Sequence, residues 1–237
     1  MSSRRARLVS TDPQVGPVPG HVVPGAPELV WRLPDVEIRK ASVSAQDNNC
    51  YVLTERFSGA QVLIDAADGA AAVLALLHRA SPEGPLLAVV TTHRHWDHHR
   101  ALAEVVHATG ARALAGAEDA TELPVPAGLL GHGDEVALGD VRLRVVALRG
   151  HTSGSIALAY TEPDGAGPVQ LFSGDSLFPG GPGKTPSPTE FASLMADLEQ
   201  RVFGVYGDDT IVHPGHGDST TLGAERPHLL QWRERGW

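Results

Sequence analysis

The chain has 237 residues, of which 42% are hydrophobic, and a formal net charge of −9. This length allows one large domain or two small ones with a real hydrophobic core, and the composition shows no break along the chain. The negative charge, without any tract rich in lysine or arginine, argues against a nucleic-acid partner, which requires a basic surface.

The N-terminal segment is predicted to differ from the rest of the chain. Residues 11–30 are rich in proline, glycine and valine, which is typical of extended backbone, so we divide the chain into an extended lead-in over residues 1–30 and a single domain over residues 31–237. The charged start is followed by no apolar stretch, which predicts no signal peptide. No apolar run reaches the ~20 residues that a membrane-spanning helix needs. Cys50 is the single cysteine, expected to be buried, so no intrachain disulfide can form. We expect a cytoplasmic protein without a membrane partner, and the sequence favours no particular oligomeric state.

The first elements of the domain are predicted to be strands. Segments 36–43, 49–54 and 62–65 are short and rich in apolar and β-branched residues, with turns between them. Residues 70–80 show the spacing of apolar side chains that indicates a helix. The continuous apolar run at 86–90 then predicts a buried strand.

A dense group of histidines follows this strand directly. Three imidazoles and a carboxylate occupy six residues, at His93, His95, Asp97 and His98. Side chains two apart on an extended chain point the same way, so His93 and His95 can bind one ion together. Asp97 and His98 fall where the strand ends and can face a second ion. Asp97 is also placed to cap the following helix, whose buried residues start at Leu102.

Three further candidate metal ligands lie where later strands end. They are His151 after a strand predicted at 141–148, Asp175 after one at 169–172, and His216 after one at 210–212. Each is next to a glycine, where the backbone can bend and leave the side chain exposed. The pattern therefore predicts a site that is assembled by the fold from distant parts of the chain.

Two helices are predicted in the last quarter of the chain, after a loop. A loop rich in glycine and proline, residues 178–187, follows Asp175 and is expected to form part of the rim of the metal cleft. Ser187 can cap the helix that begins after it, a proline suits the first helical position, and Glu190 completes a capping box. A last helix is predicted over residues 223–235.

In this order, the motifs resemble those of the metallo-β-lactamase superfamily. The matching features are His-x-His-x-Asp-His, a later isolated histidine, a Gly-Asp pair and a Gly-His-Gly run, spanning residues 93–217. The resemblance implies an α/β fold: a four-layer αβ/βα sandwich of two mixed β-sheets flanked by helices, with metals at one edge between the sheets. It also implies two metal sites that share one carboxylate. His93, His95 and His151 would hold the first ion, Asp97, His98 and His216 the second, and Asp175 would bridge the two.

This ligand set suits two divalent metal ions, with zinc expected and iron or manganese as alternatives in one or both sites. Zinc favours imidazole and carboxylate ligands, and a catalytic site keeps one position open for water. A hydroxide shared by two ions ~3.5–4 Å apart can attack an electrophilic carbonyl, and no protein nucleophile is required. Asp97 is the candidate catalytic residue, because it can orient that nucleophile.

Within the superfamily, residues 48–237 are most similar to glyoxalase II and its short bacterial relatives. The segment from Gly174 through Lys184, the capped helix and the closing His-Pro-Gly-His-Gly run carry this resemblance. It implies hydrolysis of a small S-2-hydroxyacyl thioester such as S-lactoylglutathione, which yields a hydroxy acid and a free thiol. The thiol carrier stays open, because human-type glyoxalase II has a longer helical C-terminal region that binds glutathione. Lys184 is the candidate contact for an anionic substrate, with a solvated lysine as the alternative.

Other functions stay open on the same residues. A persulfide dioxygenase uses this scaffold with one iron held by two histidines and an aspartate, here matching His93, His151 and Asp175. A lactone hydrolase is a third possibility. A metal-binding interaction module without catalysis is disfavoured by the complete ligand set. The tetrapeptide starting at Gly174 spells a serine esterase signature with Ser176 as the nucleophile, but the C-terminal stretch lacks the Asp-x-x-His that this mechanism requires.

Overall fold

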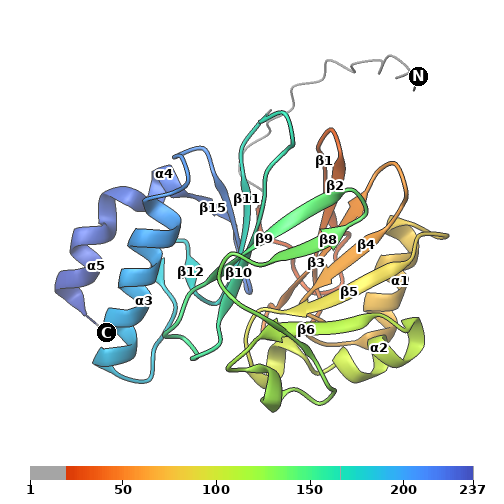
Figure 1. Cartoon of the computed structure of the whole chain (residues 1–237), viewed down its shortest axis with the longest axis horizontal. Coiled ribbons are helices and arrows are strands. Elements are labelled where there is room, and N and C mark those ends of the chain that lie inside the picture. The colour runs from red at the N-terminus through yellow and green to blue at the C-terminus, as the bar shows by residue number, and fades with distance from the viewer. Residues whose placement is uncertain (1–19, 166, 237) are drawn as a thin grey trace.

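The computed structural model describes residues 20–165 and 167–236 of the chain, and there it has four layers (Figure 1). Helices α1 (Ala70–Ala80) and α2 (Leu102–Thr109) lie on one flank, and α3 (Pro188–Leu198) and α5 (Leu229–Arg235) lie on the other. Two mixed sheets stand between them. The predicted αβ/βα sandwich is therefore confirmed.

The first sheet has seven strands within the described ranges, in the order of the chain. They are β1 (Leu29–Arg32), β2 (Val36–Ser42), β3 (Asn49–Glu55), β4 (Gln61–Ile64), β5 (Leu86–Thr91), β6 (Arg112–Gly116) and β7 (Gly128–Leu130). Neighbours are antiparallel from β1 to β4 and parallel from β4 to β7. The sequence did not predict β1, β6 or β7. Two of them contain glycine and β6 also contains alanine, residue types that are depleted in strands.

The second sheet has six strands in the same part of the chain, in the order β15-β14-β11-β10-β9-β8. Their bounds are β8 (Glu135–Leu138), β9 (Val141–Ala147), β10 (Ile156–Tyr160), β11 (Gln170–Gly174), β14 (Ile211–Pro214) and β15 (Thr220–Thr221). A small ribbon of β12 (Leu177–Phe178) and β13 (Gly181–Pro182) lies in the segment predicted to be an irregular loop.

The central strands β3, β4, β10 and β11 are buried on both faces, which explains their long apolar runs. Neighbouring residues of one strand enter different layers: Val90 packs between the sheets, while Val89 packs under α1 and α2. In the second sheet, Val145 faces the space between the sheets and Val146 packs under α3 and α5. Three apolar layers thus hold the sandwich together and fix the edges where the loops meet.

Helix α3 begins as predicted, and its cap is formed by side chains. The Ser187 hydroxyl accepts hydrogen bonds from the backbone N–H groups of Thr189 at 3.2 Å and Glu190 at 3.5 Å, and it also bonds to the Glu190 carboxylate. The helix continues into a short π-helix, Glu199–Phe203. The apolar face of these two helical segments is buried throughout and consists of Phe191, Leu194, Met195, Leu198 and Val202.

The prediction of one helix over residues 223–235 is wrong. The structure has α4 (Leu222–Glu225), a 3-10 helix (Arg226–His228) and α5 in succession. Pro227 lies in the middle of this segment. Because proline lacks the N–H group and its ring clashes with the carbonyl four residues earlier, a continuous α-helix through it is strongly disfavoured.

The described part of the lead-in packs against the domain. Val22 is buried, and the His21 ring lies 3.1 Å from a carboxylate oxygen of Asp47. Glu28 accepts hydrogen bonds from Arg39 and Arg79. The domain boundary at residue 30 stays a prediction, and residues 1–19 of the lead-in lie outside the described residues. Among the described residues, no helix has the length and apolar character required to cross a membrane.

Candidate metal centre

The histidine-rich motif lies directly after β5, at the edge where the two sheets meet. His93 lies in a bend after the strand and His95 in extended backbone, whereas Asp97 and His98 lie in a one-turn 3-10 helix, Trp96–His98. The prediction that Asp97 caps α2 is wrong, because the N-cap position of α2 is Ala101 and no side chain caps it. The Asp97 carboxylate instead accepts a hydrogen bond of 3.0 Å from the Asn48 side chain. Tertiary contacts thus replace the local capping rule at this position.

Three other connections deliver the remaining side chains to the same edge. His151 lies between β9 and β10, Asp175 between β11 and β12, and His216 after β14. All seven predicted residues come together in three overlapping groups, in each of which the nitrogen or oxygen atoms that could hold a metal lie within 4.8 Å of one another. The groups are His93, His95 and His151; His93, His98 and Asp175; and Asp97, His98 and His216.

The first group is formed by His93, His95 and His151. Nε2 of His93 faces Nδ1 of His95 at 3.1 Å, and the His95 and His151 rings are 4.5 Å apart between centroids. Nε2 of His151 is buried and has no hydrogen-bond partner. His93 is 1% exposed whereas His95 is exposed, so this group runs from the floor of the site to its mouth.

The group on the other side of the cluster is formed by Asp97, His98 and His216, and Asp175 lies between it and the first group. Nε2 of His98 lies 3.2 Å from Nε2 of His216, which in turn lies 3.4 Å from Oδ2 of Asp97. Asp175 reaches both groups: Oδ1 is 3.5 Å from His98, and Oδ2 is 3.5 Å from His216 and 3.7 Å from Nε2 of His151. Its two oxygens therefore face both sets of histidines.

The buried donor atoms of this cluster fit a divalent cation. Nε2 of His151 and Oδ1 of Asp175 are buried polar atoms without hydrogen-bond partners, and such atoms are costly unless something binds them. Both point into a cluster of imidazole nitrogens and carboxylate oxygens, which are the donors that zinc and similar metals prefer. These residues can therefore hold a divalent metal ion.

The outward-facing ring nitrogens are fixed by contacts that sequence reasoning missed. Nδ1 of His98 bonds to Oδ2 of Asp65 at 2.8 Å, and Nδ1 of His216 lies 2.8 Å from the backbone carbonyl of Gln46. Such contacts set the tautomer and direction of a ligating ring. No sequence motif marks Asp65 or Gln46, which become neighbours of the site only in the folded chain.

The electrostatics of the cluster favour positive charge at its centre. Burial opposes a charge on His98, but the carboxylates of Asp175 and Asp65 outweigh it and raise the pKa of His98 to about 10. Burial also opposes ionisation of Asp175, yet His98 and His216 hold its pKa well below the usual range. Burial, together with the neighbouring His98, keeps the pKa of His93 well below its ordinary value. A divalent cation satisfies the same preference while it leaves the imidazoles neutral.

The rim of the cluster contains the predicted loop. The backbone carbonyl of Lys184 lies 2.6 Å from Nδ1 of His151, so this residue orients the ring through its main chain. The Lys184 side chain is exposed. On another side, Trp96 is 62% exposed and the guanidinium carbon of Arg100 lies 3.5 Å from the centre of its ring. The rim therefore carries an exposed aromatic ring and an exposed lysine.

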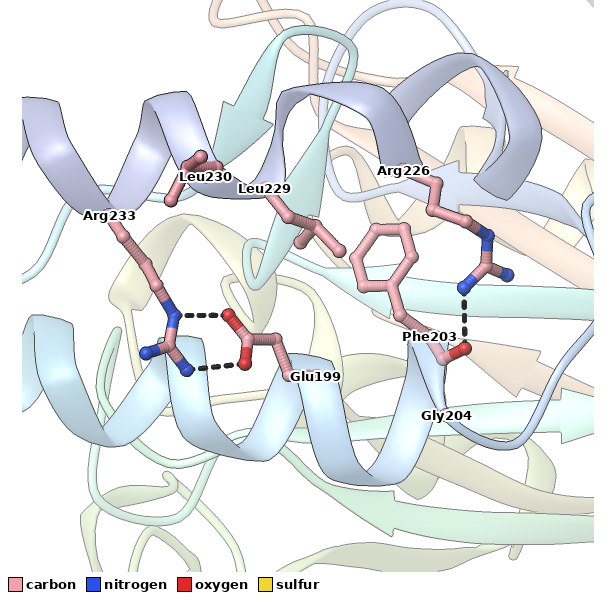
Figure 2. Close-up of a pocket in the computed structure, with 7 residues that line it drawn as sticks. All are labelled: Glu199, Phe203, Gly204, Arg226, Leu229, Leu230 and Arg233. Atoms are coloured by element: carbon pink, nitrogen blue, oxygen red, sulfur yellow. Dashed lines mark hydrogen bonds and ion pairs between the residues drawn. The ribbon is translucent and has the colours of Figure 1, made fainter.

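A separate hollow of about 530 Å³ lies away from the cluster, between the C-terminal end of α3 and α5 (Figure 2). Both of its arginines are already paired within the protein. Arg233 pairs with the carboxylate of Glu199, and Arg226 donates to the carbonyl of Phe203 at 2.6 Å. The hollow has none of the convergent histidines that mark the metal centre, so we place the chemistry at the edge of the sheets.

Comparison with known proteins assigns the family. The model of the metallo-beta-lactamase superfamily matches residues 44–216, which is most of the chain and spans all seven clustered side chains. The chain belongs to this superfamily.

Similar sequences within the superfamily include proteins that bear the name hydroxyacylglutathione hydrolase. A hydroxyacylglutathione hydrolase of Fuscovulum blasticum is 34% identical over 171 residues, which cover 72% of this chain and 63% of that protein. A hydroxyacylglutathione hydrolase-like protein of Mus musculus is 33% identical over 172 residues, covering 72% and 58%. This chain thus spans less than two thirds of the length of these two relatives. An uncharacterized protein of Mycobacterium tuberculosis is 29% identical over 205 residues, covering 75% and 89%.

Solved structures share the architecture. A metallo-beta-lactamase from Staphylococcus aureus aligns with a TM-score of 0.72 at 21% identity, covering 84% of this chain and 63% of that one. The protein TTHA1623, solved in a di-iron-bound form, aligns with a TM-score of 0.63 at 31% identity, covering 79% and 96%. The first match establishes the fold alone, and the second is a closer relative by sequence.

Proposed function

We propose that this protein is a metal-dependent hydrolase that cleaves small thioesters of the S-2-hydroxyacyl-thiol type, as glyoxalase II does. The observation that carries the proposal is the position of Asp175, whose two oxygens face both histidine groups at 3.5–3.7 Å. A shared carboxylate of this kind suits a pair of ions, and paired ions suit hydrolysis of an activated carbonyl.

In this proposal the seven side chains divide between two half-sites. The first half-site is His93, His95 and His151; the second is Asp97, His98 and His216; Asp175 joins them. When bound, two divalent cations supply a water that ionises near neutral pH and positive charge for the developing oxyanion. Zinc is our first assignment, and the di-iron-bound form of TTHA1623 supports iron as an alternative.

The protein's own groups position the reactants. His93 and His98 are buried at 1% and 0% exposure and form the floor, whereas His95 is exposed, so the thioester carbonyl approaches from the His95 side. Asp97 is held by the Asn48 amide at 3.0 Å. Its carboxylate can accept a hydrogen bond from the attacking water and fix its direction, which lowers the entropic part of the barrier.

The thioester assignment is supported by the relatives that bear the name hydroxyacylglutathione hydrolase, at 33–34% identity over 72% of this chain. Lys184 is the proposed substrate contact, because its exposed side chain extends from the loop whose carbonyl orients His151. An anionic thiol carrier such as glutathione would meet a cation at this rim.

The test is a panel of thioesters, lactones and a glutathione persulfide, run on protein of measured metal content. We expect hydrolysis of S-lactoylglutathione or a related 2-hydroxyacyl thioester, its loss on chelation, and its return with added zinc. Oxygen uptake with the persulfide and one iron per chain would replace our assignment with a dioxygenase. Turnover of lactones alone would replace it with a lactonase.

A further inference from the structure

Asp119 is a fully buried carboxylate in the turn after β6, outside the proposed set of ligands. Oδ2 accepts hydrogen bonds from the backbone N–H of Arg94 at 2.9 Å and from the Thr152 hydroxyl. Oδ1 accepts from the backbone N–H of Gly154 at 2.9 Å and from the Arg94 guanidinium at 3.1 Å. Both oxygens are thus occupied by donors that come from two distant loops.

These donors lie next to the residues of the first half-site. The Arg94 amide stands between His93 and His95, in the loop that leaves β5 of the first sheet. Thr152 and Gly154 directly follow His151, in the connection between β9 and β10 of the second sheet. One carboxylate therefore connects a loop of the first sheet with a loop of the second sheet. These two loops carry the three histidines of the first half-site.

Two glycines make this close contact possible. A Cβ on Gly116 would lie 1.9 Å from the carbonyl oxygen of Gly154, and a Cβ on Gly154 would lie 2.7 Å from Oδ1 of Asp119. Cβ atoms essentially never approach other atoms so closely. The absence of a side chain at both positions lets the turn after β6 reach the His151 loop, so the contact is built into the sequence.

We propose that Asp119 is a positioning residue that sets the placement of His151 relative to His93 and His95, and thereby the metal affinity of the first half-site. This inference rests on the two-metal site of the proposed function. Asp119 makes no hydrogen bond to the second half-site, whose rings are oriented by Asp65 and the carbonyl of Gln46. Loss of Asp119 should therefore weaken the binding of the ion in the first half-site and leave the binding of the other ion unchanged.

The experiment titrates zinc into the full-length Asp119→Asn variant in competition with a chromophoric chelator. The amide keeps the size of the carboxylate but replaces one acceptor with a donor that faces other donors. Supporting contacts of this kind are worth about 10–100-fold in metal affinity. We expect one of two zinc equivalents to weaken by about that factor and the other to change by less than about threefold. The weakened equivalent should be the one that His151→Ala abolishes, and Co²⁺ absorption spectra should show the same selective change.

Two further variants separate positioning from general instability. Thr152→Val removes one donor at nearly constant volume and should weaken the same equivalent by a smaller factor. Glu28 lies in the lead-in, and its carboxylate pairs with Arg39 and Arg79. Glu28→Gln removes this carboxylate and should change the affinity of neither zinc equivalent.

The inference is overturned if Asp119→Asn binds both equivalents as the wild type does, or weakens both equally. If Asp119→Asn does not fold, Thr152→Val decides, and an unchanged first equivalent would overturn the inference. A wild-type protein that binds two equivalents but cleaves no thioester would contradict the proposed substrate and leave this inference standing. A wild-type protein that binds no metal would contradict both.

Discussion

Gly215 packs directly against Asp175. A Cβ placed on Gly215 would lie 2.2 Å from Oδ1 of Asp175 and 2.6 Å from Cε1 of His98. The backbone cannot move aside, because Gly215 donates to the carbonyl of Gly174 at 2.9 Å and its own carbonyl accepts from the amide of Asn49 at 2.7 Å. The glycine in the His-Pro-Gly-His-Gly run thus leaves room for the carboxylate that both half-sites share.

Gly215→Ala should displace Asp175 and remove most metal binding. Overpacking of this kind costs about 1–3 kcal/mol of stability, and displacement of the shared carboxylate should lower metal affinity by at least about 100-fold. Zinc stoichiometry after dialysis and thermal unfolding measure the two effects. Gly131→Ala is the matched control, because its Cβ would meet Asp134 at an ordinary 3.6 Å. Normal zinc content in Gly215→Ala would show that the site tolerates the methyl group.

His95→Ala and Asp175→Ala should each lower the metal content and abolish activity. His95 belongs to the first group and Asp175 is shared by both. We therefore expect His95→Ala to retain up to one ion and Asp175→Ala to bind neither ion tightly, with turnover lost in both. Metal analysis by mass spectrometry and a thioester assay on the same samples provide the measurement. Full turnover with normal metal content in either variant would contradict the site.

Ser176→Ala should leave turnover within about twofold of the wild type, because hydrolysis by a metal-activated water uses no serine nucleophile. Ser176 is 1% exposed, in the turn between β11 and β12, and its backbone N–H donates to the carbonyl of Ser173 at 3.1 Å. The steady-state rate with a thioester is the measurement. A collapse of the rate with zinc content unchanged would favour the serine esterase mechanism.

Lys184→Ala should change KM and spare kcat. The substitution keeps the backbone carbonyl that orients His151, so metal content should not change. A single exposed charge contact is worth about 1 kcal/mol or less, or up to about fivefold in KM. The increase should appear with S-lactoylglutathione and vanish with a thioester of an uncharged thiol. An equal KM for both proteins with the anionic substrate would identify Lys184 as a solvated lysine.

Glu28→Gln should lower stability in a pH-dependent manner. The hydrogen bond with Arg79 is the largest cause that holds the pKa of Glu28 at about 2, below its ordinary 4.5. Because the folded-state pKa is the lower one, the stabilisation is complete above about pH 5 and disappears as pH falls towards 2. Denaturant unfolding should show a cost of about 1 kcal/mol at pH 7 that shrinks across this window. A constant difference between pH 7 and pH 3 would contradict the ion pair.

The sequence predicted the clustered side chains but not what holds them in place. His93, His95 and His98 lie close together along the chain, and local geometry after a buried strand already limits where they point. Asp65 and Asp119 carry no such local pattern. Asp65 and His98 are 33 positions apart in the sequence, and Asp119 and Gly154 are 35 apart. Only folding brings each pair within hydrogen-bond distance.

Local rules failed where tertiary contacts competed with them. Aspartate is a residue type that often caps helices, yet the Asp97 carboxylate contacts Asn48 and His216 instead. The last helix breaks at Pro227, which the spacing of apolar residues alone did not indicate. The strand β6 was not predicted, because alanine and glycine have a weak strand preference. It forms because burial between neighbouring strands outweighs that preference.

By itself, the apolar periodicity of the sequence indicated a mixture of helices and strands, because periodicity is a local property of the chain. The resemblance of its motifs to a known superfamily implied the layered fold and the roles of the seven metal-binding candidates. Only the tertiary structure decided that Gly215 leaves space for the Asp175 carboxylate and that Asp119 ties loops from opposite sheets. Those relationships depend on atoms that become neighbours only when the two sheets pack face to face.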